Sequence, residues 1–178
     1  MNERHALATA RLEMQPVEPA HAELTWPYLN DDAMWEFFPA LRPPTIEALR
    51  QRYERWRHEA PYLGAPERWE NWICVQRGDG RAVGEAQGTY TGSTIYIAYG
   101  IFLPFRRHGY AREAMRAVLD HASKVHGVHT AICEMAAGNH ASVAVAEALG
   151  FERVSIREHA ESGLGYEGRE YVYRLALY

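Results

Sequence analysis

The first part of the chain carries one strand-like pattern and two helix-like patterns of apolar residues. Leu12 and Met14 alternate with polar neighbours, as in a half-buried strand. A helix is predicted to begin at Glu18-Pro19, because proline is tolerated in a first helical turn, and to end at Pro27 or shortly after it. Thr45 is a suitable cap for a second helix. The apolar positions of that second helix recur at helical spacing and are Ile46, Leu49, Tyr53 and Trp56.

Three strand-like stretches follow, separated by short turns rich in glycine. They cover residues 72–77, 82–90 and 94–103. Such close spacing predicts an antiparallel meander. In the last stretch one face carries Ile95, Ile97, Tyr99 and Ile101. Two segments that contain several prolines, residues 37–44 and 61–66, are predicted to be irregular.

The pattern then changes to a helical period. Apolar residues between Ala111 and Val125 recur as in an amphipathic helix, which is predicted to end at Gly127. Residues 128–135 have the continuous apolar character of a buried strand. Asn139 is then predicted to cap another helix, which Gly150 ends.

Two final strands complete the predicted order. They cover residues 151–159 and 171–178, and a glycine-rich loop joins them. Strands and helices alternate through most of the chain, which predicts an α/β fold. We expect a single domain over residues 1–178, with a mixed, mostly antiparallel twisted sheet flanked by helices.

Composition excludes several classes of protein. Of 178 residues, 47% are apolar and 24% are charged, as in ordinary globular domains, and the formal net charge is -4. That balance gives no electrostatic basis for binding nucleic acid. Cys74 and Cys133 are too few for a disulfide framework, and no Cys/His motif predicts a metal site. No stretch of about 18 apolar residues and no leading apolar run occurs, so we expect a cytoplasmic protein without membrane association.

The run Leu103–Ala111 carries the most chemical information. It joins a predicted strand to a predicted helix. Gly109 lets the backbone approach a ligand closely, and unpaired amide groups at the helix start would point at an anion such as pyrophosphate. Neither GxGxxG nor GxxxxGK[ST] occurs in the chain. On its own, this run is also compatible with a turn that binds nothing.

Two motifs in order resemble those of the GNAT acetyltransferases. Arg106-x-x-Gly109-x-Ala111 matches the family pattern Q/R-x-x-G-x-G/A. Asn139-x-x-Ser142, followed by Leu149-Gly150-Phe151, resembles the second conserved block. The resemblance covers nearly the whole chain and is greatest to the ribosomal-protein N-terminal acetyltransferases, whose second block reads N-x-x-S-x-x-V-x-E-x-L-G-F.

The resemblance implies that acetyl-CoA is the acetyl donor, and because no Cys/His motif occurs we expect no metal. The phosphate loop would hold the pyrophosphate, and its residues are Arg106, Arg107, His108, Gly109, Tyr110 and Ala111. The end of the preceding strand would pair with the pantetheine arm and polarise the thioester carbonyl, through Ile101, Phe102 and Leu103. Asn139 matches a position that contacts CoA, and it would serve equally well as a helix cap.

Acetyl transfer to an amine needs a base for the amine and an acid for the departing thiolate. Glu134 lies on an otherwise apolar strand, where desolvation would raise its pKa, and it matches a glutamate proposed as the base in related enzymes. The alternative is a structural role for Glu134. The base would then be solvent, a carboxylate such as Glu85, or a carboxylate near the final hairpin. Ala146 stands where many family members have a tyrosine acid. Ser142 matches the serine that serves the thiolate in the ribosomal-protein branch, or it is only a small residue near a helix start.

The sequence therefore leaves two functions open. The first is direct transfer of an acetyl group to a primary amine, either a protein N-terminus or a small molecule. The second is a non-catalytic module that binds acyl-CoA, which Ala146 in the tyrosine position leaves open. A homodimer is compatible with either function. The fold does not fix the acceptor.

Overall fold

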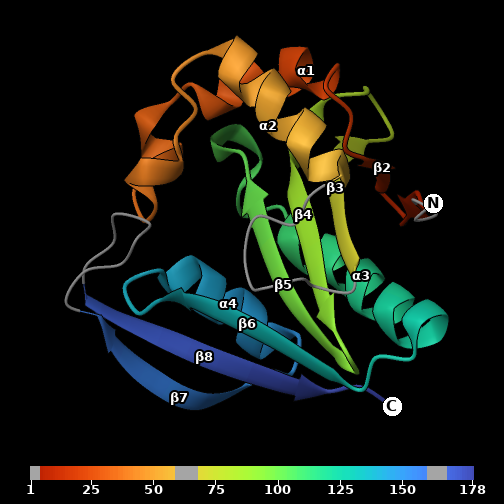
Figure 1. Cartoon of the computed structure of the whole chain (residues 1–178), viewed down its shortest axis with the longest axis vertical. Coiled ribbons are helices and arrows are strands. Elements are labelled where there is room, and N and C mark those ends of the chain that lie inside the picture. The colour runs from red at the N-terminus through yellow and green to blue at the C-terminus, as the bar shows by residue number, and fades with distance from the viewer. Residues whose placement is uncertain (1–4, 59–67, 160–167) are drawn as a thin grey trace.

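The computed structural model describes residues 5–58, 68–159 and 168–178. The loop predicted at residues 61–66 falls outside these ranges, as do residues 160–167 of the loop predicted between the two final strands. Within them, eight strands form one sheet in the order β1-β2-β3-β4-β5-β6-β8-β7 (Figure 1). This arrangement is the mixed, mostly antiparallel α/β fold that the sequence predicts. None of the described helices is long and apolar enough to span a membrane.

The elements follow the predicted order closely. The strands are β1 (Leu7–Ala8), β2 (Leu12–Pro16), β3 (Arg68–Gln76), β4 (Ala82–Thr91), β5 (Thr94–Ile101), β6 (Thr130–Ala136), β7 (Glu152–His159) and β8 (Gly168–Ala176). The helices are α1 (His21–Leu29), α2 (Ile46–His58), α3 (Tyr110–His126) and α4 (His140–Ala148). Short 3₁₀ turns lie at Asp32–Trp35, Pro39–Leu41 and Leu103–Phe105.

The strands β5 and β6 pair over only part of their length. Their parallel register joins Thr94–Tyr96 to Thr130–Ile132 and then stops. Beyond that point β5 continues beside β4, and β6 continues beside β8, so the two strands diverge (Figure 1). No described strand pairs with this edge of β5 from residue 97 to residue 101, so an extended ligand could lie along it.

The helices cover both faces of the sheet. On one face α3 packs against β4 and β5, and α4 packs against β6. On the other face α1 and α2 pack together above β3 and β4. Successive side chains of β4 point to opposite faces of the sheet. On one face Glu85 contacts Tyr53 of α2, and on the other face Tyr90 contacts His126 of α3.

Two predicted boundaries, the start of β3 and the end of β5, are wrong for identifiable reasons. β3 begins at Arg68, four residues before the prediction, because the polar residues Glu70 and Asn71 are buried and break the apolar pattern. α1 continues through Pro27 and ends at Leu29, in agreement with the predicted end. β5 ends at Ile101, and the next residues form a 3₁₀ turn instead of extending the strand.

His21 at the start of α1 should make the stability of the fold depend on pH. Its ring is buried, with Nδ1 accepting from the Glu18 amide at 2.9 Å and Nε2 lying 3.0 Å from Gln15 Oε1. Burial lowers the pKa of His21, and the nearby Glu18 only partly opposes this. Below about pH 6.5 the unfolded chain takes up the proton first, so the free energy of unfolding should fall as the pH falls.

Thermal unfolding of the wild type and a His21→Gln variant between about pH 8 and pH 5 measures this contribution. The variant should lose less stability than the wild type on acidification, because its side chain cannot take up a proton. Parallel loss in the two proteins would assign the pH dependence to other groups.

Candidate active site

The loop before α3 has the backbone geometry of an anion site. Gly109 caps α3 in the left-handed region with φ 81°, and Arg107 is also left-handed with φ 65°. Gly109 has no side chain with which to cap the helix, so the first amides of α3 are left for a ligand or water. The positive end of the helix dipole favours a negative charge there. These are the residues that the sequence assigned to pyrophosphate binding.

Arg11, from the connection between β1 and β2, fixes this loop in place. Its Nη1 donates to the His108 carbonyl at 2.9 Å, and its Nε donates to Glu113 Oε2 at 2.7 Å. Its guanidinium also lies 4.5 Å from the centre of the Tyr110 ring. No local pattern in the sequence connects Arg11 to this loop almost a hundred residues away, so its role is visible only in the structure.

A groove of about 440 Å³ lies along the side of α3 that faces β1. It is lined in part by His108, Gly109 and the exposed side chains of Arg112 and Arg116. These two arginines offer positive charge beside the loop. The groove is on the opposite side of α3 from α4, so it is not the path along β5 and β6 that the pantetheine arm would take.

The strand end assigned to the thioester is partly occupied by internal hydrogen bonds. The Phe102 amide donates to the Val83 carbonyl at 3.0 Å, and Arg106 Nε donates to the Ile101 carbonyl at 3.1 Å. Of the three residues proposed there, Phe102 is fully buried. A bound pantetheine arm would therefore share the Ile101 carbonyl with the Arg106 side chain or replace it there.

The start of α4 brings two predicted residues together. The Asn139 side chain caps the helix by accepting from the Ser142 amide at 3.1 Å. Tyr99 of β5 donates its hydroxyl to the Ser142 carbonyl at 3.3 Å, and burial raises the pKa of Tyr99 to about 12. In the sequence, Tyr99 is only one position on an apolar strand face. Ala146 is buried one turn further along α4 than Ser142.

Glu134 does not have the desolvated environment expected for a base. It is exposed, and Arg157 Nη1 lies 2.8 Å from its Oε1. The adjacent Cys133 pairs with Tyr173, whose hydroxyl donates to Glu147 of α4. Strand alternation therefore places Glu134 on the face away from α4.

Glu85, in contrast to Glu134, lies in a desolvated position. It lies in the middle of β4 and accepts a short hydrogen bond from the Tyr53 hydroxyl, which also lies 2.8 Å from Thr25 Oγ1. Burial raises the pKa of Glu85, although the hydrogen bond from Tyr53 and the charge of Arg52 counteract part of the rise.

Open space lies beside this carboxylate. Glu85 pairs with Gly100 of β5, and directly paired residues point to the same face of a sheet. A Cβ atom built on Gly100 would meet no other atom within 4 Å. The space borders the edge at which β5 leaves β6, so a substrate placed there would lie beside both Glu85 and that edge.

Fold, phosphate-loop geometry and motif order define one class of protein. The family model described as "Acetyltransferase (GNAT) domain" matches residues 11–152. The chain belongs to the GNAT acetyltransferase family and is an acetyl-CoA-dependent N-acetyltransferase by class. Comparison with curated proteins gave no significant match.

Solved structures of the same fold include acetyltransferases named for ribosomal proteins and for microcin C7 self-immunity. RimL, a ribosomal L7/L12 alpha-N-protein acetyltransferase in complex with coenzyme A, has a TM-score of 0.82 at 15% identity, with 97% of this chain and 98% of RimL covered. The microcin C7 self-immunity acetyltransferase MccE, in complex with acetyl-CoA and AMP, has a TM-score of 0.80 at 15% identity, covering 95% and 94%. A ribosomal-protein-S5-alanine acetyltransferase from Vibrio fischeri has a TM-score of 0.77 at 14% identity, covering 97% and 96%.

Proposed function

We propose that this chain acetylates a primary amine by direct attack on acetyl-CoA, with a protein N-terminus as the first acceptor to test. The observation that carries the proposal is the pairing of two features on one strand–loop–helix unit. The free edge of β5 can hold an extended pantetheine arm, and the start of α3, capped by Gly109, can hold the pyrophosphate. Two of the three similar structures are named for acetylation of ribosomal proteins, which motivates the choice of acceptor.

This placement brings the thioester to the point where β5 and β6 diverge. On one side of that point lie Tyr99 and Ser142, beside α4. On the other side lies the open space next to Gly100 and Glu85. The amine would enter from the Glu85 side, and the thiolate would leave toward Ser142. Most of the acceleration would come from holding amine and thioester together.

Glu85 is the base that we propose, in place of Glu134. A general base must be able to take up a proton near the working pH, and a raised pKa brings a carboxylate closer to that range. Burial raises the pKa of Glu85, whereas Glu134 is exposed and ion-paired with Arg157. The buried Tyr53 hydroxyl orients the Glu85 carboxylate.

Ser142 remains the proposed group for the departing thiolate, as the family resemblance implies. A Ser142→Ala variant should lower kcat by about 10-fold or more and leave the affinity for acetyl-CoA near that of the wild type. Steady-state kinetics together with calorimetry of acetyl-CoA binding separates these effects. Ser155→Ala, which changes an exposed serine on β7, is the matched control. A loss of affinity without a loss of turnover would make Ser142 a contact residue only.

An acceptor panel tests the proposed function. The full chain is assayed with acetyl-CoA and a set of amines that contains short peptides with free N-termini, polyamines and amino acids. We expect kcat/KM to be highest for one peptide N-terminus and to vanish when that terminus is blocked. A small amine that outperforms every peptide would overturn the choice of acceptor. Tight acetyl-CoA binding with no product from any amine would support the non-catalytic alternative.

A further inference from the structure

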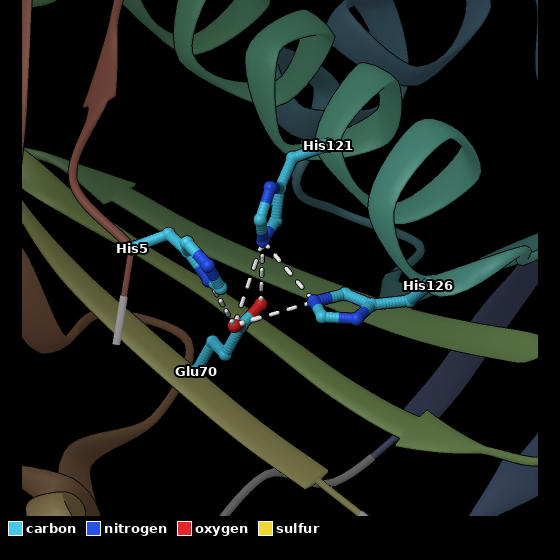
Figure 2. A group of neighbouring side chains, drawn as sticks. All are labelled: His5, Glu70, His121 and His126. Atoms are coloured by element: carbon cyan, nitrogen blue, oxygen red, sulfur yellow. Dashed lines mark hydrogen bonds and ion pairs between the residues drawn. The ribbon is translucent and has the colours of Figure 1, made fainter. Parts of the chain in front are cut away.

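Four side chains with metal-binding atoms converge at the end of α3 that is remote from the phosphate loop. His5 precedes β1, Glu70 lies on β3, and His121 and His126 lie on the last turns of α3 (Figure 2). One donor atom from each side chain can be chosen so that all four lie within 4.8 Å of one another. These side chains point toward a common centre between the helix and the sheet (Figure 2).

The spacing of these atoms is close to that of a tetrahedral zinc site. His121 Nε2 and His126 Nε2 lie 3.2 Å apart. Glu70 Oε1 lies 3.5 Å from His121 Nε2, 3.4 Å from His126 Nε2 and 3.9 Å from His5 Nδ1. Ligands at about 2.0–2.1 Å from a tetrahedral zinc ion stand about 3.3 Å from each other. Only His5 has to move inward to complete such a site.

Without a cation, hydrogen bonding cannot satisfy the contacts among Glu70, His121 and His126. An ionised carboxylate only accepts, and each imidazole nitrogen either donates or accepts. If both rings donate to Glu70, two donors face each other at the 3.2 Å contact between the rings. If one ring nitrogen accepts instead, its lone pair faces the lone pairs of the carboxylate, and no hydrogen lies between the two acceptors. A cation at the centre removes this conflict, because all the lone pairs then point at positive charge.

Neighbouring groups orient the ligands as in known metal sites. The Tyr90 hydroxyl donates to Glu70 Oε2 at 2.7 Å, which leaves Oε1 facing His126 and His5. The Trp72 indole donates to the His5 carbonyl at 2.7 Å and holds that backbone against the sheet. The side chains of Glu70 and His121 are each only 6% exposed, so a bound ion would be shielded from water.

Among the residues that the structure describes, the charge of Arg68 opposes a cation at this position. Arg68 Nη1 lies 3.6 Å from Glu70 Oε1, and the Arg68 side chain is 29% exposed. A bound ion would displace this guanidinium toward solvent. Within residues 5–58, 68–159 and 168–178, the three imidazoles and the Tyr90 phenol also face the centre, and none of them carries an obligatory positive charge.

We propose that His5, Glu70, His121 and His126 form a binding site for a single zinc ion. Three imidazoles and one carboxylate suit zinc, and four protein ligands leave no open position for catalysis. Gly109 precedes His121 by twelve helical positions, which places the site about 18 Å along α3 from the phosphate loop. The ion would join the segment before β1, strand β3 and the end of α3, and so stabilise the fold. The sequence predicts no metal site, because these ligands are dispersed over more than a hundred residues.

The test uses the full chain without a histidine tag, because a tag beside His5 would add further imidazoles. Protein treated with EDTA and then dialysed is titrated with Zn²⁺ alone by calorimetry, in the absence of acetyl-CoA. We expect one ion to bind per chain and to raise Tm by about 5–10 °C when free zinc is 100 times Kd. Co²⁺ in place of zinc should give the intense visible absorption of a four-coordinate ion.

Three variants probe the ligands, and one serves as a control. Glu70→Gln and His126→Ala should weaken zinc binding by at least about 100-fold. His5→Ala should weaken it by about 10-fold, since His5 is the most exposed ligand, and it is the change least able to disturb the core. His129→Ala, which alters an exposed histidine three residues beyond His126, should bind zinc like the wild type.

Circular dichroism in EDTA shows whether each variant is folded before its zinc affinity is compared. A folded wild type that binds no stoichiometric zinc would overturn the proposal, as would a folded His5→Ala variant with unchanged affinity. In that case the four groups form only a buried polar network. Binding and Tm are measured without substrate, so these outcomes do not depend on the acetyltransferase activity.

Discussion

A Gly109→Val variant is expected to bind acetyl-CoA about 100-fold more weakly than the wild type. Gly109 holds φ at 81°, a conformation that costs an L-residue about 1–2 kcal/mol, and more for a β-branched side chain. The space itself is adequate, because a Cβ at this position meets only Arg11 Nη2 at 3.5 Å. The strain would instead turn the first amides of α3 away from the pyrophosphate. Losing one or two charge-assisted hydrogen bonds, each worth about 1.5–3 kcal/mol, accounts for the expected change.

A matched variant separates this effect from general destabilisation. Gly80, in the turn between β3 and β4, has φ 71° and is exposed with nothing near its Cβ position. Gly80→Val should therefore suffer similar backbone strain and lose a similar amount of thermal stability, yet bind acetyl-CoA normally. Calorimetry of both variants compares the two affinities directly. Equal affinity in folded Gly109→Val and wild-type protein would show that the pyrophosphate binds elsewhere.

A Glu85→Gln variant is expected to lower kcat/KM by about 100-fold near pH 7, within the range typical of a lost general base. Glutamine keeps the size of the side chain and an oxygen that can accept from Tyr53, but it cannot take a proton. The α-amino group of a peptide has a pKa near 8, so at low pH most of the acceptor is protonated. The defect should therefore be largest at low pH and shrink above about pH 8. Rates measured across this range give the comparison.

Glu134→Gln is the matched control for the base. An exposed ion pair such as Glu134–Arg157 contributes about 0–1 kcal/mol, so this variant should keep its rate within about fivefold. A larger loss in Glu134→Gln than in Glu85→Gln would return the role of base to Glu134. A constant ratio of Glu85→Gln to wild-type rates across the pH range would leave deprotonation to solvent.

Local patterns in the sequence were sufficient for most of the fold. The meander of β3, β4 and β5 was predictable because its turns are short and contain glycine, and α3 was predictable because seventeen residues repeat one apolar period. The phosphate loop was also predictable from a local pattern, since Gly109 and the strand and helix on either side of the loop are contiguous in the sequence. The start of β3 was not predictable from the sequence. The partners that allow Glu70 to be buried are Tyr90 on β4 and His121 on α3, which are distant in the sequence.

The chemical surroundings of the site depended on contacts that no local pattern contains. Glu85 and Glu134 both interrupt apolar strands, and only the packed structure shows that Tyr53 covers one whereas solvent and Arg157 surround the other. Arg11 is likewise far from the phosphate loop in the sequence. Only the folded structure brings its side chain to the His108 carbonyl. The backbone framework of the site could therefore be predicted from the sequence. The roles of its side chains could be assigned only from the tertiary structure.

Mass spectrometry of a peptide amine incubated with acetyl-CoA and the full chain tests the central claim most directly. We predict that the wild type adds one acetyl group to the peptide N-terminus, with release of one free CoA thiol per acetyl group transferred. Gly109→Val should produce little product at acetyl-CoA concentrations that saturate the wild type. An unmodified amine across peptides and small molecules, from folded protein that binds acetyl-CoA, would contradict the assignment as an acetyltransferase.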